Sequence, residues 1–219
     1  MDLDNVQSQT GITLVGGGDP NPKDIAESVA LAPHLVAVDG GANFCLAAGF
    51  FPTAVIGDLD SITASSRASL PDARFIEITE QTSTDFEKAL THVDAPFVLG
   101  SGFTDGRQDH TLAVYSALLR RLGPPTILLS REEIIFAAPD KLALDLKAGV
   151  RVSLFPMVPV QGRSTGLHWP IEGLTLDPMG RIGTSNVSTG AVTLEFDNPG
   201  CLVLMPRATL RTVIAGIAG

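Results

Sequence analysis

Two aspartates that follow a short apolar run are the residues of this sequence best placed to do chemistry. Asp58 and Asp60 come after residues 54–56, in the segment Gly57-Asp58-Leu59-Asp60-Ser61. If the chain is extended there, residues two apart share a side, so the two carboxylates point together while Leu59 turns inward. Crowded carboxylates repel unless a proton or a cation joins them, and Mg²⁺ takes one or two carboxylates beside water and phosphate oxygens. The pattern favours a magnesium site over the alternative that these are ordinary turn residues.

Other acidic residues also follow apolar runs. Asp19 comes after residues 12–15, and Asp39 comes after residues 35–38. For Asp39 taken alone, a turn residue and a functional residue are equally good interpretations, because Asp is common in turns after strands. Four acids placed after three expected strands nevertheless predict that several carboxylates lie along one edge of a sheet.

A third acidic position opens an expected helix. Thr84 and Glu87 have the spacing of a capping box, and Asp85 would sit favourably at the positive end of the helix, so a purely structural account is available. The same helix start would also bring Asp85 to the metal and Lys88, one turn later, to a phosphate group. The motif by itself leaves the two interpretations balanced.

A glycine-rich segment, residues 100–107, leads into another expected helix. Such loops allow backbone N–H groups to approach an anion, although this one lacks the GK[ST] ending of a P-loop and the spacing of GxGxxG. Arg107 is a candidate for holding phosphate, and Asp109 and His110 are able to orient one another. For His110, a solvent-facing side chain without a role is the preferred interpretation.

The elements that must position these residues alternate along the first 130 residues. Strands are expected at residues 12–15, 35–38, 54–56, 74–78, 97–99 and 127–129, and helices at 22–32, just before Gly49, at 85–92 and at 111–122. Strands alternating with helices predict an α/β domain with a mostly parallel, Rossmann-like sheet flanked by helices. Ligands bind beyond the carboxyl ends of the strands in such sheets, which is where the acids fall.

The pattern changes after about residue 141. Short strand-like runs at 150–155, 173–176, 191–196 and 202–205 are separated by frequent Gly and Pro, which predicts a small antiparallel β-sandwich or barrel. The pattern of residues 210–217 is equally compatible with a helix and with a strand. We therefore expect two domains, an α/β domain over residues 1–140 and a small antiparallel β domain over residues 141–219.

Charge and composition narrow the class of protein. The formal net charge is −9, and it is unevenly divided, with 19 acidic and 8 basic residues in 1–140 against 5 and 7 in 141–219. This acidity argues against nucleic acid and anionic membrane surfaces as partners. Cys45 and Cys201 are too few for a disulfide framework and are expected to be small buried residues. Residues 1–4 lack a signal-peptide pattern and no apolar run suits a membrane helix, so a cytoplasmic protein is expected.

Six short blocks together resemble the signature of the thiamine pyrophosphokinase family. In order they are VDGGAN (38–43), GDLDSI (57–62), STDFEKAL (83–90), GRQDHTLA (106–113), GLHWPI (166–171) and GTSN (183–186). The resemblance implies an ATP-binding α/β domain and a β-sandwich in a homodimer, with thiamine between one subunit's α/β domain and the other's sandwich. It also implies Mg²⁺-dependent transfer of a pyrophosphoryl group from ATP to the thiamine hydroxyl, with release of AMP.

The resemblance assigns roles by position. The matched catalytic acids are Asp39, Asp58, Asp60 and Asp85, of which Asp58, Asp60 and Asp85 are the expected metal ligands, and the ATP-side positions are Gln81, Lys88, Arg107 and Asp109. Ser185 and Asn186 match the thiamine-side pair. Trp169 is a candidate for stacking on thiamine, with a buried core tryptophan as the alternative. Asp85 is the favoured base for the hydroxyl proton.

The sequence departs from the family pattern at three positions. Leu59 replaces a common aromatic residue, Val114 stands where Asn is common, and Val187 stands where some relatives carry an aromatic residue. Two other functions remain open on the acids alone. One is a Mg²⁺-dependent phosphohydrolase or nucleotidyl-sugar transferase, and the other is a non-catalytic module that senses nucleotide or thiamine.

Overall fold

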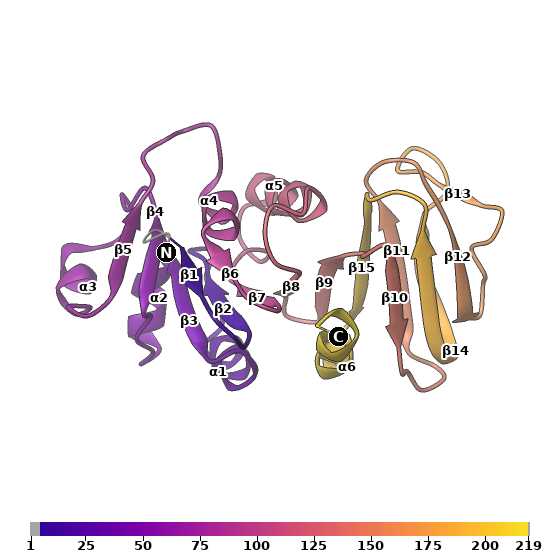
Figure 1. Cartoon of the computed structure of the whole chain (residues 1–219), viewed down its shortest axis with the longest axis horizontal. Helices are drawn as coiled ribbons and strands as arrows, with labels where there is room; N and C mark the ends of the chain where they lie inside the picture. The colour runs from indigo at the N-terminus through magenta and orange to yellow at the C-terminus, as the bar shows by residue number, and fades with distance from the viewer. Residues whose placement is uncertain (1–4, 219) are drawn as a thin grey trace. The chain divides into compact units, whose positions relative to one another are not determined.

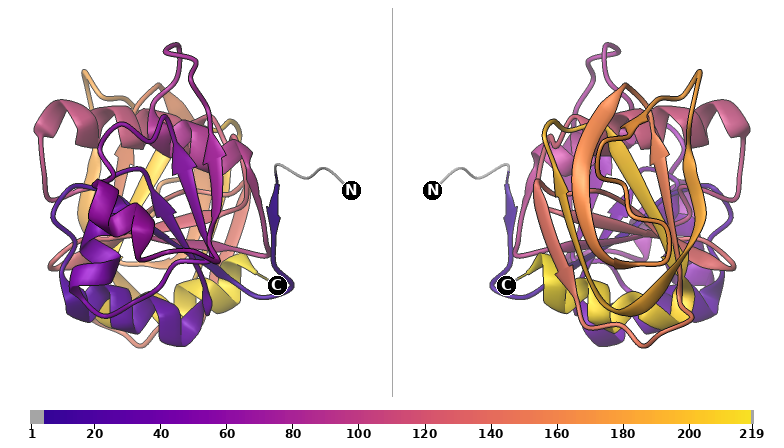
Figure 2. Two further views of the ribbon diagram at one scale, coloured as in Figure 1. Left: turned by 90° about the vertical axis from the view of Figure 1, so that its left-hand side faces the viewer. Right: turned by 90° about the vertical axis from the view of Figure 1, so that its right-hand side faces the viewer.

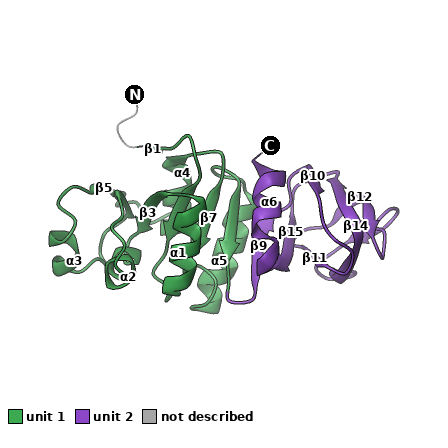
Figure 3. Ribbon diagram, turned by 90° about the horizontal axis from the view of Figure 1, so that it is seen from below, with its two compact units in different colours: residues 1–130 green, residues 131–219 purple. Residues whose placement is uncertain are grey.

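The computed structural model describes residues 5–218, which fall into two compact units, unit 1 over residues 1–130 and unit 2 over residues 131–219 (Figure 3). Residues 1–4, on which the expectation of no signal peptide rested, lie outside the described part. Over residues 5–218, no helix is both long enough and apolar enough to cross a membrane.

Unit 1 is built on a parallel sheet. Its strands are β2 (Ile12–Val15), β3 (His34–Val38), β4 (Ala54–Gly57), β5 (Arg74–Glu77), β7 (Val98–Ser101) and β8 (Thr126–Leu129), in the spatial order β8-β7-β2-β3-β4-β5. The direction of travel along the sheet reverses between β2 and β7. In open α/β sheets this switch point opens a crevice beyond the carboxyl ends of the strands. A separate short parallel pair joins β1 (Val6–Gln7) to β6 (Val93–Asp94).

Helices cover both faces of this sheet (Figures 1 and 2). They are α1 (Pro22–Leu31), α2 (Gly41–Ala47), α3 (Ala64–Ala68), α4 (Asp85–Thr91) and α5 (Gln108–Leu119). Because crossovers between parallel strands are right-handed, α1 and α2 lie on one face and α4 and α5 on the other. Double coverage explains why the central strands are buried along their whole length.

The expected α/β fold is confirmed, and most differences lie at element ends. Helix α1 begins at Pro22, with the Asn21 side chain accepting a hydrogen bond from the Lys23 backbone N–H. Helix α5 begins at Gln108, three residues before the predicted start. The short helix α3, capped by Thr63, was not predicted, because a five-residue helix with no buried residue leaves no apolar periodicity in the sequence.

Unit 2 consists of antiparallel strand pairs and a C-terminal helix. The strands are β9 (Glu133–Ala137), β10 (Lys141–Leu144), β11 (Arg151–Pro156), β12 (Val160–Leu167), β13 (Thr175–Leu176), β14 (Gly183–Phe196) and β15 (Cys201–Pro206). Strand β14 is long and has two sets of partners, since its first half pairs with β11 and its second half with β10 and β12. Strand β15 pairs with both β11 and β9.

Several elements of unit 2 were not expected. Strands β9, β10 and β12 and the first half of β14 are absent from the prediction. The undecided C-terminal stretch forms helix α6 (Leu210–Ile217) after a short 3₁₀ turn, η1 (Arg207–Thr209), and α6 packs against β10. The predicted domain boundary at residue 140 falls between β9 and β10, whereas the two units divide at residue 130. The backbone hydrogen bonds between β9 and β15 explain why β9 belongs to unit 2.

Candidate functional site

A cavity of about 870 Å³ lies in unit 1 beyond the carboxyl ends of the parallel strands. Its lining comes from the segments that follow four strands. These segments contribute Gly16 to Asp19 after β2, Asp39 after β3, Asp58 and Asp60 after β4, and Gly102 and Arg107 after β7. The segment after β5 and residues of helices α2, α4 and α5 complete the lining. This is the edge at which the sequence predicted the acidic residues.

Three carboxylates converge in this cavity. One oxygen each from Asp39, Asp58 and Asp60 lies within 4.8 Å of the others, the one group of potential metal ligands of this kind in the described part of the chain. Asp39 is 8 % exposed. Two oxygens bound to one Mg²⁺ are roughly 3–4 Å apart, because each Mg–O distance is about 2.1 Å. Side-chain shifts of about 1 Å would therefore suffice for the three residues to hold a magnesium ion.

The turn that carries Asp58 and Asp60 is not extended, so that assumption was wrong. Leu59 adopts a left-handed conformation with φ 62°, which is unfavourable for a residue with a Cβ. Its side chain is 9 % exposed and belongs to the core cluster with Val55. The backbone N–H of Asp60 reaches back to Asp58 Oδ1 at 3.4 Å. The two aspartates nevertheless face the same cavity while Leu59 points inward, as predicted, because the Leu59 side chain anchors the turn in the core.

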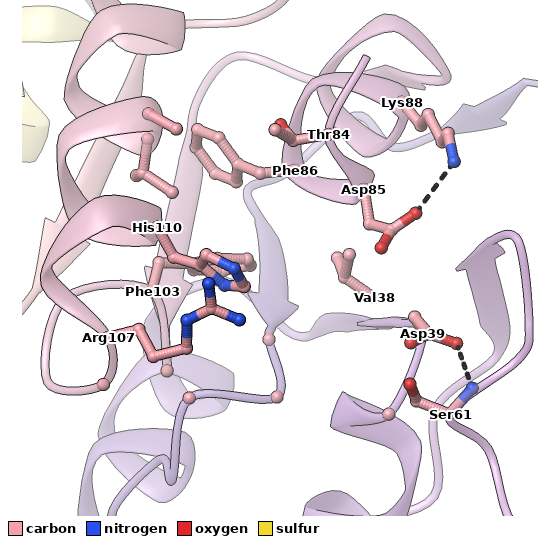
Figure 4. A pocket seen from close by; sticks show the side chains of 18 of the residues that line it. Val38, Asp39, Ser61, Thr84, Asp85, Phe86, Lys88, Phe103, Arg107 and His110 are labelled. Carbon is pink, nitrogen blue, oxygen red and sulfur yellow. Dashed lines mark hydrogen bonds and ion pairs between the residues drawn. The ribbon is translucent and has the colours of Figure 1, made fainter. Parts of the chain in front are cut away.

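A buried lysine joins the acids on the α4 side. Lys88 Nζ lies 3.1 Å from Asp85 Oδ1 and 3.9 Å from Asp58 Oδ2, and its side chain is only 3 % exposed. Figure 4 shows Asp85 and Lys88 paired on α4, on the same side of the cavity as Asp39. Asp85 is not in the group formed by Asp39, Asp58 and Asp60, so its role as a metal ligand stays a prediction.

The start of α4 is held by the predicted capping box. Thr84 Oγ1 accepts a hydrogen bond from the Glu87 N–H, and Glu87 Oε2 accepts one from the Thr84 N–H at 2.7 Å. Glu87 is 8 % exposed and also forms an ion pair with Arg120, at the end of α5. The structural interpretation of this motif is therefore correct, and the same cap places Asp85 and Lys88 at the cavity.

The opposite side of the cavity is basic and aromatic. Arg107 and His110 project from the start of α5 beside Phe103 (Figure 4). Arg107 is paired with Asp109 at 2.6 Å, and hydrogen bonds from its guanidinium hold the pKa of Asp109 below its usual range. Asp109 does not itself line the cavity. His110 does line the cavity, although the sequence favoured no role for it. Its position directly after Asp109 was the sequence feature that could have indicated a role.

Two further lining residues are tied to the acids. Gln81, expected on the ATP side, places Nε2 3.4 Å from Asp58 Oδ2. Ser61 was not singled out from the sequence, although it belongs to the block with Asp58 and Asp60. Its N–H donates to Asp39 Oδ1 at 3.2 Å and its hydroxyl to Asp60 Oδ1 at 2.8 Å. Ser61 thus connects the aspartate after β3 with the turn after β4.

The residues expected on the thiamine side lie in unit 2. The Asn186 side chain is buried, donating to Trp169 O at 2.7 Å and accepting from Trp169 N–H at 3.1 Å. Trp169 is 58 % exposed, so the alternative of a buried core tryptophan is wrong. Ser185 is exposed and left-handed, with φ 63°. Asn186 therefore holds the segment that presents the Trp169 ring to solvent.

Three kinds of comparison with known proteins find similarity to thiamin pyrophosphokinases. The model of the thiamin pyrophosphokinase catalytic domain matches residues 26–127. A Caenorhabditis elegans protein named thiamin pyrophosphokinase 1 is 28 % identical over 185 residues, covering 75 % of each chain. The solved thiamin pyrophosphokinase of Geobacillus thermodenitrificans aligns with a TM-score of 0.73 and 25 % identity over 90 % of this chain and 96 % of that one. The Candida albicans thiamin pyrophosphokinase aligns with a TM-score of 0.75 and 16 % identity over 94 % and 95 %, a likeness of fold.

Proposed function

We propose that the chain is a member of the thiamine pyrophosphokinase family and that it transfers the pyrophosphoryl group of ATP to the hydroxyl group of thiamine, producing thiamine diphosphate and AMP. The observation that carries this proposal is the convergence of Asp39, Asp58 and Asp60 in one cavity, with Lys88 behind them. These residues lie within the segment that the catalytic-domain model matches.

We propose that Asp39, Asp58 and Asp60 hold Mg²⁺. Their donor set is all carboxylate oxygen, which suits a hard cation, and the three oxygens are close enough to share one ion after small shifts. A bound magnesium ion would neutralise phosphate charge in the transferring group. An acidic cavity without such an ion repels a polyphosphate, so the acids and the proposed substrate are compatible only with a cation between them.

The chain's own cations and bases have separate tasks in this proposal. Lys88 stands beside Asp58 and Asp85 and is placed to meet phosphate oxygens that develop charge during transfer. Arg107, on the opposite wall, supplies a second positive group for the nucleotide, and Gln81 and Asp109 are proposed to support the ATP side. Asp85 lies outside the three-acid group and is our candidate for accepting the proton of the thiamine hydroxyl.

The thiamine side is proposed to come from unit 2 of a second subunit. A tryptophan that is 58 % exposed, held by a buried asparagine, is an unusual surface feature for a ring of this size. We propose that Trp169, Ser185 and Asn186 face thiamine in a homodimer, with Trp169 packing on its aromatic ring. The thiazolium of thiamine is a cation, so the acidic cavity also favours it electrostatically. A cytoplasmic location is part of the same proposal.

Product analysis tests the reaction. Purified protein incubated with Mg·ATP and thiamine should give AMP and thiamine diphosphate in equal amounts. Phosphorus NMR measures both products. ADP or free phosphate as the product would refute pyrophosphoryl transfer. Release of phosphate from ATP with water as the sole acceptor would instead identify a phosphohydrolase, and Mg²⁺-independent ATP binding without turnover would identify a sensing module.

A further inference from the structure

Asn43, in the first turn of α2, has both ends of its side-chain amide bound to the turn that carries the acids. Nδ2 donates to Ser61 O at 2.9 Å, and Oδ1 accepts from the Thr63 N–H at 3.1 Å. A carbonyl oxygen only accepts and a backbone N–H only donates, so a single orientation of the amide satisfies both partners. Asn43 also lines the cavity. It therefore clamps the segment after β4 onto the segment after β3.

The clamped turn needs such support. Leu59 and Asp39 both adopt left-handed conformations, with φ 62° and φ 45°, and residues of this kind persist only where surrounding contacts hold them. The peptide of Ser61 lies between the two strained segments, since its N–H donates to Asp39 Oδ1 and its carbonyl accepts from Asn43. Its hydroxyl donates to Asp60 Oδ1. Holding Ser61 therefore holds two of the three acids.

We propose that Asn43 is a positioning residue for the metal-binding acids, acting through Ser61 to keep Asp39 and Asp60 within reach of one cation. This rests on the proposed function only in that it requires the metal site. The physical reason is preorganisation: without the clamp, the strained turn relaxes and the carboxylates separate under their own repulsion. Groups that orient metal ligands from behind commonly change metal affinity by about 10- to 100-fold when they are removed.

Titration of Mn²⁺ into the nucleotide-free protein tests this, with free Mn²⁺ measured by electron paramagnetic resonance. Asn43→Ala is expected to weaken Mn²⁺ binding by about 10- to 100-fold. The matched control is Asn21→Ala, which removes another asparagine side-chain bond in unit 1, the cap of α1 at Lys23 N–H. That control should lower the melting temperature and leave Mn²⁺ affinity unchanged. Asp58→Asn is expected to abolish Mn²⁺ binding, which would show that the titrated ion binds at the three-aspartate site.

The outcomes separate the two proposals. Wild-type Mn²⁺ affinity in Asn43→Ala, with Asp58→Asn impaired, overturns the positioning role and leaves the metal site standing. Wild-type affinity in Asp58→Asn overturns the metal site, and the positioning role falls with it. If Asn43→Ala does not fold, Asn43→Ser takes its place, because the shorter hydroxyl side chain cannot span both partners. Weakened Mn²⁺ binding in a folded variant at Asn43, against an unchanged Asn21→Ala, supports the proposal.

Discussion

Replacing Lys88 with Met is expected to tighten divalent-metal binding while lowering turnover. The Lys88 ammonium lies 3.9 Å from Asp58 Oδ2 and 3.1 Å from Asp85 Oδ1, in a side chain that is 3 % exposed. Methionine has a similar length and removes the charge. Because the ammonium shares the carboxylates with the proposed metal, its loss leaves the acids more negative and the metal less repelled.

The size of the effect follows from these distances. A metal bound through Asp58 Oδ2 at about 2.1 Å lies no more than about 6 Å from Lys88 Nζ. At 6 Å, a double and a single positive charge repel by about 1.4 kcal/mol in a dielectric of 80, which is about tenfold in the dissociation constant. A lower effective dielectric makes the change larger. Turnover should fall by about 10²- to 10³-fold, the usual cost of losing one group that stabilises transition-state charge.

The assay combines Mn²⁺ titration with measurement of AMP release, and Lys23→Met is the control. Lys23 is exposed on α1 and does not line the cavity, so its variant should match the wild type in both measurements. The metal-free Lys88→Met protein should also melt at a lower temperature, because Asp58 and Asp85 lose their buried counter-charge. Added Mn²⁺ should recover part of that loss by binding the folded state.

Unchanged or weaker Mn²⁺ binding in folded Lys88→Met would refute this reasoning. It would mean that the ammonium does not compete with the metal and that the proximity of Lys88 to Asp58 has no electrostatic consequence for the site. Wild-type turnover in the same variant would separately remove Lys88 from the transfer step. A change of equal size in Lys23→Met would show that overall charge, not position, governs metal binding.

The remaining predictions concern particular residues. Asp58→Asn should abolish turnover and change the circular-dichroism melting curve little, because the amide has the same shape as the carboxylate. An active Asp58→Asn variant would exclude Asp58 as a metal ligand. Mixing Asp58→Asn with Trp169→Ala should restore about a quarter of wild-type activity if subunits share sites, because half the dimers are mixed and each holds one intact site. No recovery would place the whole site within one subunit. Burial raises the pKa of Cys45 and Cys201 to about 12, so about 10⁻⁴ of each thiol is ionised at pH 8. Both thiols should therefore react with a disulfide reagent only after the protein unfolds. The free energy of unfolding should be highest below about pH 8.5, the pKa of a thiol in the unfolded chain, and should fall as the pH rises towards 12. The reason is that the thiols ionise in the unfolded chain before they ionise in the folded one. Thr84→Ala should cost about 1 kcal/mol in denaturant unfolding through loss of the α4 cap, and turnover should fall with it; intact turnover would show that the cap does not position the acids.

The positions of the sheet strands along the chain of unit 1 could be predicted from the sequence, for a physical reason. Strands buried on both faces appear as mostly apolar runs, as in β2 and β4, and the turns that follow them carry Gly and Asp. The capping box at Thr84 was equally predictable, because all its contacts lie within four residues. Unit 2 was less accessible. Strand β12 has few buried residues, the buried residues in the first half of β14 are the polar Asn186 and Ser188, and both segments contain glycine, all of which weakens the apolar signal.

The sequence by itself determined the chemistry available to this protein, namely which acids follow which strands and which lysine lies one turn after Asp85. Tertiary structure alone decided which of them meet. Asp39 joins Asp58 and Asp60, and Lys88 reaches Asp58, because these distances depend on strand register and on a turn that Leu59 holds in a left-handed conformation. That conformation is unfavourable in isolation and is stable here because the Leu59 side chain is packed into the core. Local sequence carries no record of such long-range contacts.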